Sequence, residues 1–373
     1  MQSNRYPGFR WVRGWEFRLV QLAMLAQLWW IAFRRYGDIK TATQAFRKLL
    51  NHGDQVLANQ KLARGFQLNG RYGWDMFHPL WPSPAFKQFF EQHYEELMPI
   101  GKNKWPLRRL LIALTKRCPL ACAHCSEWDS LNQADILSRE ELESKIQGML
   151  NRGISQLVYS GGEPLVRWQD LLYLLERFRD QSQWIYSSGY GLTLEKAKAL
   201  KDAGLEGIAV SLDHHDPAGH DAFRGSNRSF QWVEQSIQHA QAAGLLVSVN
   251  VCPTREYLDE SGLKPFMELM HQWQVPIVNV LEPRAVGHFA GQEVELLSRH
   301  KDYLAELFYE YNFAPTHQHY PILTYPGLSR RYIPCGGGRS YLLLDYDGTL
   351  RPCPFCKTPL SLKEDVRIAR CEA

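Results

Sequence analysis

Three cysteines in one short stretch of the chain have the spacing of metal ligands: Cys118, Cys122 and Cys125. Three residues separate the first pair, and two separate the second. Thiolates at this spacing can bind three irons of a cubane [4Fe–4S] cluster and leave its fourth iron without a protein ligand, able to bind and reduce a small molecule. A structural zinc site needs a fourth ligand, and the nearest candidate, His124, lies between two of the cysteines.

A glycine-rich turn with a carboxylate follows the cysteines. Gly161 and Gly162 let the backbone approach a ligand closely, and Glu163 can pair with an ammonium group. Together with the cysteine triplet, this Gly-Gly-Glu-Pro segment resembles the radical S-adenosylmethionine (SAM) superfamily. The resemblance implies that the open iron chelates SAM and that an electron cleaves SAM to methionine and a 5′-deoxyadenosyl radical, which abstracts hydrogen from a substrate. It also implies that Glu163 and adjacent backbone groups hold the SAM amino group.

Further segments are similar to family motifs that surround SAM. Ser188 lies in a turn where the family often has Thr/Ser-Asn-Gly. The segment Ser211-Leu-Asp213, followed by a His-Asp-Ala-Phe-Arg-Gly run that ends at Gly225, implies that Ser211 and Asp213 lie near the ribose and that Arg224 meets the SAM carboxylate. Asn250 lies on a strand that would flank the adenine. A surface loop with solvated charges is the alternative interpretation of Arg224.

A second set of cysteines lies towards the C-terminus: Cys335, Cys353, Cys356 and Cys371. With a hairpin turn at Asp347-Gly348, their spacing resembles the SPASM/Twitch auxiliary domains of radical SAM enzymes. A full SPASM domain has more cysteines, so the resemblance implies a Twitch-like or shortened domain with one second, auxiliary [4Fe–4S] cluster. A four-cysteine zinc site is the competing interpretation.

Residues 106–312 alternate strand and helix patterns, which is typical of βαβ units in a parallel sheet. Six strands are predicted, over residues 110–115, 156–160, 184–187, 207–212, 246–252 and 276–281. Helices are predicted near residues 138–152, 168–179, 194–203, 230–243 and 263–273, with another from about 293. Ser138 and Glu141 predict a capping box, and Gly204 and Gly244 predict helix C-caps. This pattern predicts an α/β protein with a partial (β/α)6 radical SAM barrel, whose ligands gather at the carboxyl ends of the strands.

The regions on either side of this core have different sequence patterns. Residues 1–105 are predicted to form a mostly helical N-terminal extension, with a helix near 41–50 and an aromatic, core-forming stretch in which Pro79, Pro82 and Pro84 disfavour a long helix. The apolar run Leu19–Phe33 is shorter than the ~20 residues of a membrane span, so it predicts either a buried helix or a peripheral membrane contact. Residues 313–373 are predicted to form a small Cys-rich auxiliary domain that a metal stabilises.

Composition limits the compartment and the partners. The chain has 373 residues, a net charge of +4 and eight cysteines. It has no Lys/Arg run, so no nucleic acid partner is expected, and its cysteines are too sparse for a disulfide scaffold. No secretory signal is convincing, and an oxygen-sensitive cluster requires a reducing environment. We therefore expect a cytoplasmic protein, with peripheral membrane contact as the alternative.

The function predicted from these motifs is that of a radical SAM enzyme. The resemblance is strongest with the subgroup that includes peptide maturases, pyrroloquinoline quinone and mycofactocin pathway enzymes, and sulfatase maturases. It implies a peptide or protein side chain as substrate, a precursor peptide as partner, and a reductant such as flavodoxin or ferredoxin. Two alternatives remain: modification of a lipid, isoprenoid or other small metabolite at the membrane, and a non-catalytic iron–sulfur electron-transfer or zinc scaffold protein. No catalytic acid or base can be assigned.

Overall fold

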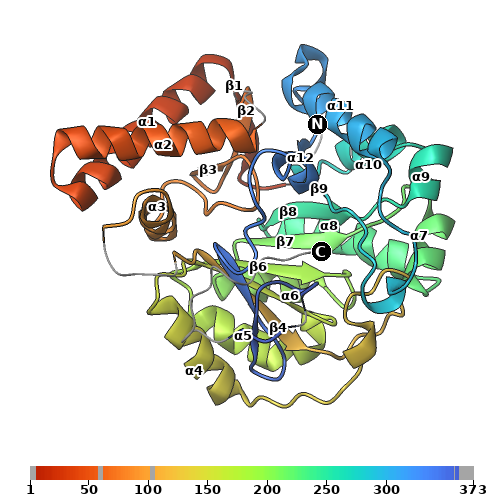
Figure 1. Ribbon diagram of the computed structural model, residues 1–373. Helices are drawn as coiled ribbons and strands as arrows, with labels where there is room; N and C mark the ends of the chain where they lie inside the picture. The colour runs from red at the N-terminus through yellow and green to blue at the C-terminus, as the bar shows by residue number, and fades with distance from the viewer. Residues whose placement is uncertain (1–5, 58–61, 101–105, 357, 361–373) are drawn as a thin grey trace.

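A nine-stranded sheet forms the centre of the protein (Figure 1). The structure, a computed structural model, describes residues 6–57, 62–100, 106–356 and 358–360. The strand order is β10-β9-β8-β7-β6-β5-β4-β11-β12. The six predicted strands lie side by side in chain order and are parallel: β4 Arg109–Thr115, β5 Gln156–Gly161, β6 Ser182–Ser187, β7 Gly207–Ser211, β8 Leu246–Val251 and β9 Ile277–Val280. This arrangement confirms the predicted α/β class and the open parallel sheet, which does not close over the described residues.

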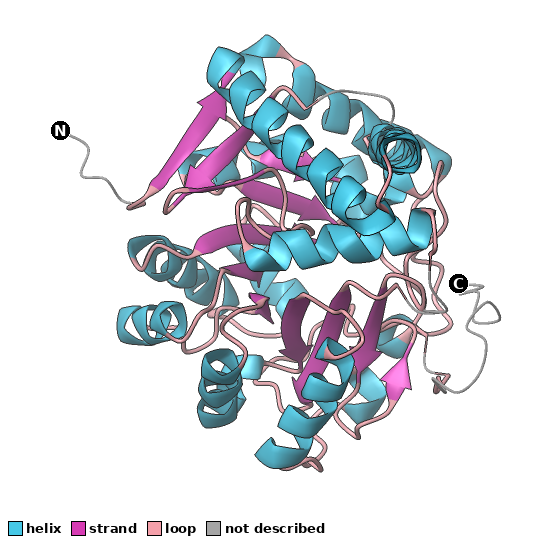
Figure 2. Ribbon diagram, turned by 90° about the vertical axis from the view of Figure 1, so that its left-hand side faces the viewer, coloured by secondary structure: helices cyan, strands magenta, loops and turns pink. Residues whose placement is uncertain are grey.

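Helices follow the strands and lie along the outer side of the curved sheet (Figure 2). They are α4 Arg139–Leu150, α5 Trp168–Arg177, α6 Leu194–Asp202, α7 Pro217–Arg224, α8 Ser229–Ala242, α9 Arg255–Glu260, α10 Lys264–Gln272 and α11 Ser298–Phe313. Three single turns of 3-10 helix complete the loops of this half: η1 Trp128–Ser130, η2 Pro164–Arg167 and η3 Gly287–Phe289. Helices α7 and α9 were not predicted, although each has a capping side chain, from Asp216 and Thr254 respectively.

The predicted helix caps are present. Ser138 and Glu141 form a reciprocal capping box at the start of α4. Gly204 and Gly244 follow α6 and α8 with φ angles of 109° and 73°, which only glycine adopts at little cost. These local signals fix where the helices stop and therefore where the next strand begins.

The C-terminal segment continues the central sheet at both edges. Strand β10 (Ile322–Thr324) pairs in parallel with β9, and β11 (Tyr341–Leu344) pairs in parallel with β4. Strand β12 (Leu350–Arg351) returns antiparallel to β11 across the predicted hairpin turn at Asp347-Gly348. Between β10 and β11 lies α12 (Pro326–Ser329), and η4 (Pro315–His317) follows α11. The sheet thus runs across the boundary expected near residue 313, while the division into domains stays a prediction.

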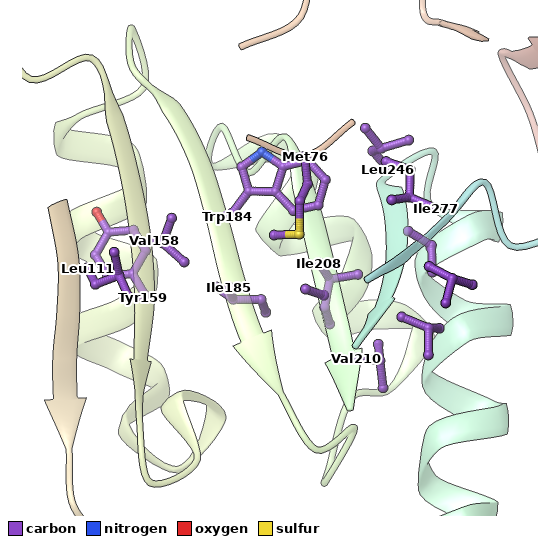
Figure 3. Close-up of a cluster of buried hydrophobic side chains, with 14 of the residues drawn as sticks. Met76, Leu111, Val158, Tyr159, Trp184, Ile185, Ile208, Val210, Leu246 and Ile277 are labelled. Atoms are coloured by element: carbon purple, nitrogen blue, oxygen red, sulfur yellow. The ribbon is translucent and has the colours of Figure 1, made fainter. Parts of the chain in front are cut away.

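Apolar side chains fill the space between the sheet and its helices. Figure 3 shows Val158, Ile185 and Ile208 on neighbouring strands, with Met76 of the N-terminal extension beside Trp184. All five side chains are buried. Because a residue from the extension belongs to the same cluster as the strands, burial of this core also holds the extension against the sheet.

The N-terminal extension combines three helices with a small sheet. Its elements are β1 Phe9–Arg13, α1 Gly14–Tyr36, α2 Ile39–Val56, β2 Arg64–Leu68, β3 Arg71–Gly73 and α3 Pro84–Leu97. The three strands form an antiparallel sheet in the order β1-β2-β3, which the sequence analysis did not predict. As predicted, no helix runs through Pro79 or Pro82; α3 begins only at Pro84, which occupies the first turn, where proline is tolerated.

The helices of the extension have a core of their own. Buried side chains of α1, α2 and α3 pack together, including Leu28, Ala45 and Phe90. The apolar run Leu19–Phe33 lies within α1, and one of its faces is buried in this core. Across the described residues, no helix has both the length and the apolar character required to pass through a bilayer.

Candidate functional site

The three cysteines of the triplet lie in the loop that leaves the carboxyl end of β4. Cys122 is buried, and Cys118 and Cys125 are partly exposed. The backbone N–H of Cys125 donates to the carbonyl of Cys122, and the N–H of Cys118 donates to the side chain of Asn132. Burial raises the pKa of the Cys118 thiol to about 12, and Glu163, Cys122 and Cys125 add to this shift. The loop therefore brings the three thiols and Glu163 within electrostatic reach of one another.

The donor set of this loop, three thiols at short spacing, suits the irons of a cubane. Within the described ranges, no group of three or more His, Cys, Asp or Glu side chains is placed to hold one metal ion. In a cubane each cysteine binds a different iron, so its sulfur ligands do not converge on one point. His124, the nearest candidate for a fourth zinc ligand, stacks on Phe223 with ring centroids 4.8 Å apart.

The two glycines allow the next loop to pack directly on the cysteine loop. The N–H of Gly162 donates to the carbonyl of Thr115 (2.7 Å), and the N–H of Glu163 donates to that of Arg117 (2.9 Å). A Cβ atom at Gly162 would lie 2.4 Å from the Arg117 carbonyl oxygen, and Gly161 has a φ of 125°. Both positions therefore require glycine if the ends of β4 and β5 are to touch.

Glu163 joins the carboxyl ends of β5 and β6. Its buried carboxylate accepts hydrogen bonds from the backbone of Leu165 (3.1 Å), from the Ser187 hydroxyl (2.9 Å), and from both the N–H (2.7 Å) and the hydroxyl (2.6 Å) of Ser188. Burial raises the pKa of Glu163, while these donors favour its ionised form. The structure thus brings two predicted site residues, Glu163 and Ser188, into direct contact. The predicted contact of Glu163 with the SAM amino group stays a prediction.

Arg224 is buried at the end of α7 and is held there by Asp213. Their closest nitrogen–oxygen distance is 2.5 Å, and the other oxygen of Asp213 accepts from the N–H of Cys252 (2.9 Å). Burial opposes ionisation of Asp213, but Arg224 above all holds its pKa below the ordinary range. On its far side, Nη1 of Arg224 lies 3.6 Å from Sγ of Cys122. Arg224 is only 8% exposed, and this excludes the interpretation of Arg224 as part of a solvated surface loop.

The strand residues predicted to surround SAM lie next to one another. Ser211 and Asn250 are paired across β7 and β8. Asn250 accepts a hydrogen bond from the Asn279 amide (2.9 Å), which also donates to Ser248 (3.0 Å). Thr324 donates to the side-chain oxygen of Asn279. The sequence analysis missed this buried polar network, although polar residues two apart on a buried strand, such as Ser248 and Asn250, are a signal for it.

A buried ion-pair network connects the cysteine loop to the C-terminal hairpin. Lys116 follows β4 directly and is fully buried. Its ammonium contacts the carboxylates of Glu127 and Asp345, the latter at 2.8 Å, and Asp345 also contacts Arg351 at 2.7 Å. Asp345 follows β11, so both ends of the cysteine loop are tied to the β11–β12 hairpin. A charged residue immediately after an apolar strand was the sequence signal for this contact.

The loop after β9 covers the cysteine loop from the other side. The Nδ1 atom of His288 lies 2.9 Å from the carbonyl oxygen of Cys122, and its backbone N–H donates to the carbonyl of Cys125 (2.9 Å). The His288 ring also stacks on Trp128, with centroids 3.8 Å apart and ring planes at 2°. His288 was not among the predicted site residues, since only the folded chain brings it to this loop.

Three of the four C-terminal cysteines come together beside β11. Cys353 and Cys356 form a β-bridge, and the N–H of Gly337 lies 3.5 Å from Sγ of Cys335. Burial raises the pKa of Tyr341, and nearby Cys335 and Cys353 raise it further. A Cβ atom on Gly337 would lie 3.4 Å from the Cβ of Cys353. These contacts bring Cys335 and Cys353 next to Gly337, and the bridge places Cys356 beside Cys353. Cys371 lies outside the described residues.

Comparison with known proteins relates this geometry to a family. Residues 112–268 match the model of the Radical SAM superfamily. A GTP 3',8-cyclase of Nitrobacter winogradskyi is 36% identical over 210 residues, which cover 53% of this chain. The match spans only 58% of that cyclase's own length.

Two solved structures show the same fold at low sequence identity. Streptococcus suis SuiB bound to precursor peptide SuiA is 15% identical, with a TM-score of 0.55 over 90% of this chain and 79% of that chain. The protein anSMEcpe with bound AdoMet is 17% identical, with a TM-score of 0.52 over 68% of this chain and 76% of that one. Residues 112–268, which include the cysteine triplet and the Gly-Gly-Glu-Pro turn, therefore carry a radical SAM domain.

Proposed function

We propose that the protein binds a [4Fe–4S] cluster through Cys118, Cys122 and Cys125 and uses it to cleave SAM reductively. When bound, such a cluster supplies the electron that splits the sulfonium into methionine and a 5′-deoxyadenosyl radical, and this radical takes a hydrogen atom from the substrate. The observation that carries the proposal is that the three thiols, Glu163 and Arg224 meet at the carboxyl ends of β4, β5 and β7. An electron donor such as flavodoxin or ferredoxin is the partner that this chemistry requires.

Protein side chains prepare this site for SAM. Glu163 holds the turn after β6 in place through Ser187 and Ser188. Arg224 places a positive charge beside the Cys122 sulfur, where ligation creates negative charge. Gly161 and Gly162 leave the backbone of the loop open to a close approach. These contacts support a role for Gly161, Gly162, Glu163, Ser188, Ser211, Asp213, Arg224 and Asn250 around SAM.

The test of this function uses protein purified and reconstituted with iron and sulfide under anaerobic conditions. Addition of SAM should perturb the EPR spectrum of the reduced cluster, and dithionite should yield 5′-deoxyadenosine. Single C118A, C122A and C125A variants should form none, while C252A, which removes a buried thiol outside the triplet, should form it at a normal rate. An EPR spectrum that SAM leaves unchanged in the wild-type protein would reject the proposal.

A second, auxiliary cluster is proposed at the C-terminal cysteines. Cys335 and Cys353 lie next to Gly337, Cys356 is bridged to Cys353, and Cys371 would supply the fourth thiolate. The Lys116–Asp345 ion pair connects this region to the cysteine loop of the radical SAM domain. A full set of four protein ligands leaves no open iron, so this cluster would transfer electrons rather than bind and cleave SAM.

We infer that the substrate is a peptide or protein side chain. The C-terminal cysteines support this class because they resemble the auxiliary domains of peptide maturases. The small sheet of the extension adds a structural argument, because β1 is an edge strand that pairs only with β2 within the described residues. An extended peptide can bind to such an edge by forming one more strand.

Two other substrate classes have support of their own. The cyclase relative, by its name, acts on GTP, and a nucleotide is therefore the first competitor. A lipid, isoprenoid or other small metabolite is the second, and the apolar surface of α1 favours it. The match to the radical SAM model does not favour the third alternative, a non-catalytic iron–sulfur or zinc scaffold protein.

One experiment separates the three substrate classes. Extract of the native cell is fractionated, and fractions are screened for stimulation of 5′-deoxyadenosine formation in deuterated buffer. A peptide substrate predicts that protease treatment abolishes the stimulation. Loss after phosphatase treatment would assign a nucleotide, and extraction of the stimulating activity into chloroform would assign a lipid. Either of these outcomes would reject the peptide.

A further inference from the structure

Helix α1 presents an apolar face to solvent. Trp15, Leu19, Leu22 and Trp30 are 76, 56, 62 and 52% exposed. At 100° per residue these four side chains fall within one third of the helix circumference, and the exposed Ala26 lies between them. The outer face of α1, defined by Trp15, Leu19, Leu22, Ala26 and Trp30, is therefore a continuous apolar strip.

The packing of α1 within the protein does not account for this strip. The opposite face of the helix is already buried. Leu28, Ile31 and Ala32 pack against α2 and α3, and the buried Phe17 lies against Gly65 of β2. A helix that packs on one side normally has polar residues on the other. Figure 1 shows α1 and α2 as an arm that projects from the central sheet, with α1 on its outer side. Exposed apolar strips of this kind mark an interaction surface.

The charges around the outer face are positive. Arg18 and Arg34 are exposed and border the strip on opposite sides and near opposite ends. The sequence from Phe17 to Gly37 has no Asp or Glu. The nearest acidic residue, Glu16, is engaged by Arg10 at 2.5 Å. A partner for this face should therefore combine apolar groups with negative charge.

We propose that the outer face of α1 binds the surface of an anionic phospholipid bilayer. Its leucines and tryptophans enter the boundary between headgroups and acyl chains, where tryptophan is favoured, and its arginines contact lipid phosphates. A second copy of the chain is a poorer partner. Pairing of two outer faces in either direction would gather four arginines around one apolar seam, and neither helix has an acidic residue between Phe17 and Gly37 to offset them.

This inference is independent of the proposed chemistry, since its test measures lipid binding. The full-length protein is floated with vesicles of pure phosphatidylcholine or of phosphatidylcholine and phosphatidylglycerol in equal parts. It should bind the anionic vesicles, and added salt should weaken binding. The double variant L19S/L22S should bind at least tenfold more weakly, because it removes two apolar anchors. The double variant R18Q/R34Q should lose about fivefold per arginine on the anionic vesicles.

Matched controls keep the result interpretable. I136S changes a side chain that is as exposed as Leu22 but lies outside α1, and R152Q removes an exposed arginine that is likewise not part of α1. Both should bind like the wild type, and circular dichroism should show that every variant is folded. The proposal would be overturned if wild-type protein floated with neither kind of vesicle. It would also be overturned if L19S/L22S bound the vesicles as well as the wild type does. A dimer in sedimentation that L19S/L22S dissociates would assign this face to a second copy instead.

Discussion

The Nη1 atom of Arg224 lies 3.6 Å from the Sγ atom of Cys122. Neighbouring contacts fix this distance: the N–H of Ala123 donates to the carbonyl of Phe223, and a Cβ on Gly225 would lie 2.8 Å from the carbonyl of Ala121. The end of α7 is thus packed on the cysteine loop, and Asp213 holds the guanidinium from behind. A positive charge so close to a ligating sulfur favours the reduced form of a cluster, because reduction adds negative charge.

The variant R224Q tests this relationship. The reduction potential of the cluster in this variant, measured by EPR-monitored titration, should be lower than in the wild type. The variant should also lose about 3–5 kcal/mol of unfolding free energy in urea, because Asp213 keeps a buried charge without its main partner. The double variant R224Q/D213N removes both charges, so it should regain stability, and its cluster potential should lie between those of R224Q and the wild type. An R224Q potential equal to that of the wild type would show that Arg224 has a purely structural role.

The Lys116 network predicts a second effect on stability. Burial lowers the pKa of Lys116, but Glu127 and Asp345 raise it above the ordinary value, so the ammonium stays charged. D345N should cost about 3 kcal/mol of unfolding free energy, and K116M should cost more because it takes the cation from two buried carboxylates. Urea denaturation of both variants checks the order. R152Q serves as the surface control, and a D345N variant as stable as this control would contradict the expectation.

Sequence patterns were sufficient for the central strands. Strands β4 to β9 are apolar runs that end at turn residues, and parallel strands in βαβ units pair in chain order. Pairing between distant segments was not visible in the same way. β11 joins β4 across more than two hundred residues, and β1 is separated from β2 by two helices. Such short strands carry little periodicity, so their pairing is decided by tertiary contacts.

The candidate site was predictable to a similar extent. The cysteine triplet and the Gly-Gly-Glu-Pro turn are local patterns, and their proximity follows from the shared edge of a parallel sheet. The partners of these residues are not local. Ser187 and Ser188 reach Glu163 from the next strand, and His288 reaches the cysteine loop from the loop after β9. Nothing in the chain near residue 163 or 122 encodes those contacts.

A variant of one C-terminal cysteine should separate the contributions of the two proposed clusters. C353A should lower the iron and sulfide content by the amount of one cluster, since Cys353 lies beside Cys356 and Gly337. Cleavage of SAM to 5′-deoxyadenosine should continue at a measurable rate, while formation of the modified substrate should stop. Metal analysis provides the contrast with a zinc site. One equivalent of zinc in the wild type that C353A loses, with iron unchanged, would reject the auxiliary cluster.

Because of His93 in α3, the free energy of unfolding should depend on pH, and the proposed metal sites should not influence this dependence. Burial above all, with help from Arg108, lowers its pKa well below the ordinary 6.5. Neither ring nitrogen has a hydrogen-bond partner among the residues the structure describes, and the ring packs 6.0 Å from that of Phe90. As pH falls below 6.5, the unfolded chain takes up a proton that the folded chain refuses. The free energy of unfolding should therefore fall, by up to about 1.4 kcal/mol per pH unit.

The pair of variants H93L and H93Q isolates this contribution. Both lack the titrating ring, so in urea denaturation between pH 7 and pH 5 both should lose about 2 kcal/mol less than the wild type. H93L should in addition be more stable than wild type at pH 7 by about 1 kcal/mol, because an apolar side chain replaces two unpaired polar atoms. H93Q should not show this gain, since its amide is buried without a partner as well. If both variants kept the full pH dependence of the wild type, His93 would have to be protonated in the folded protein, and the packing of α3 against α1 and α2 would tolerate a buried charge.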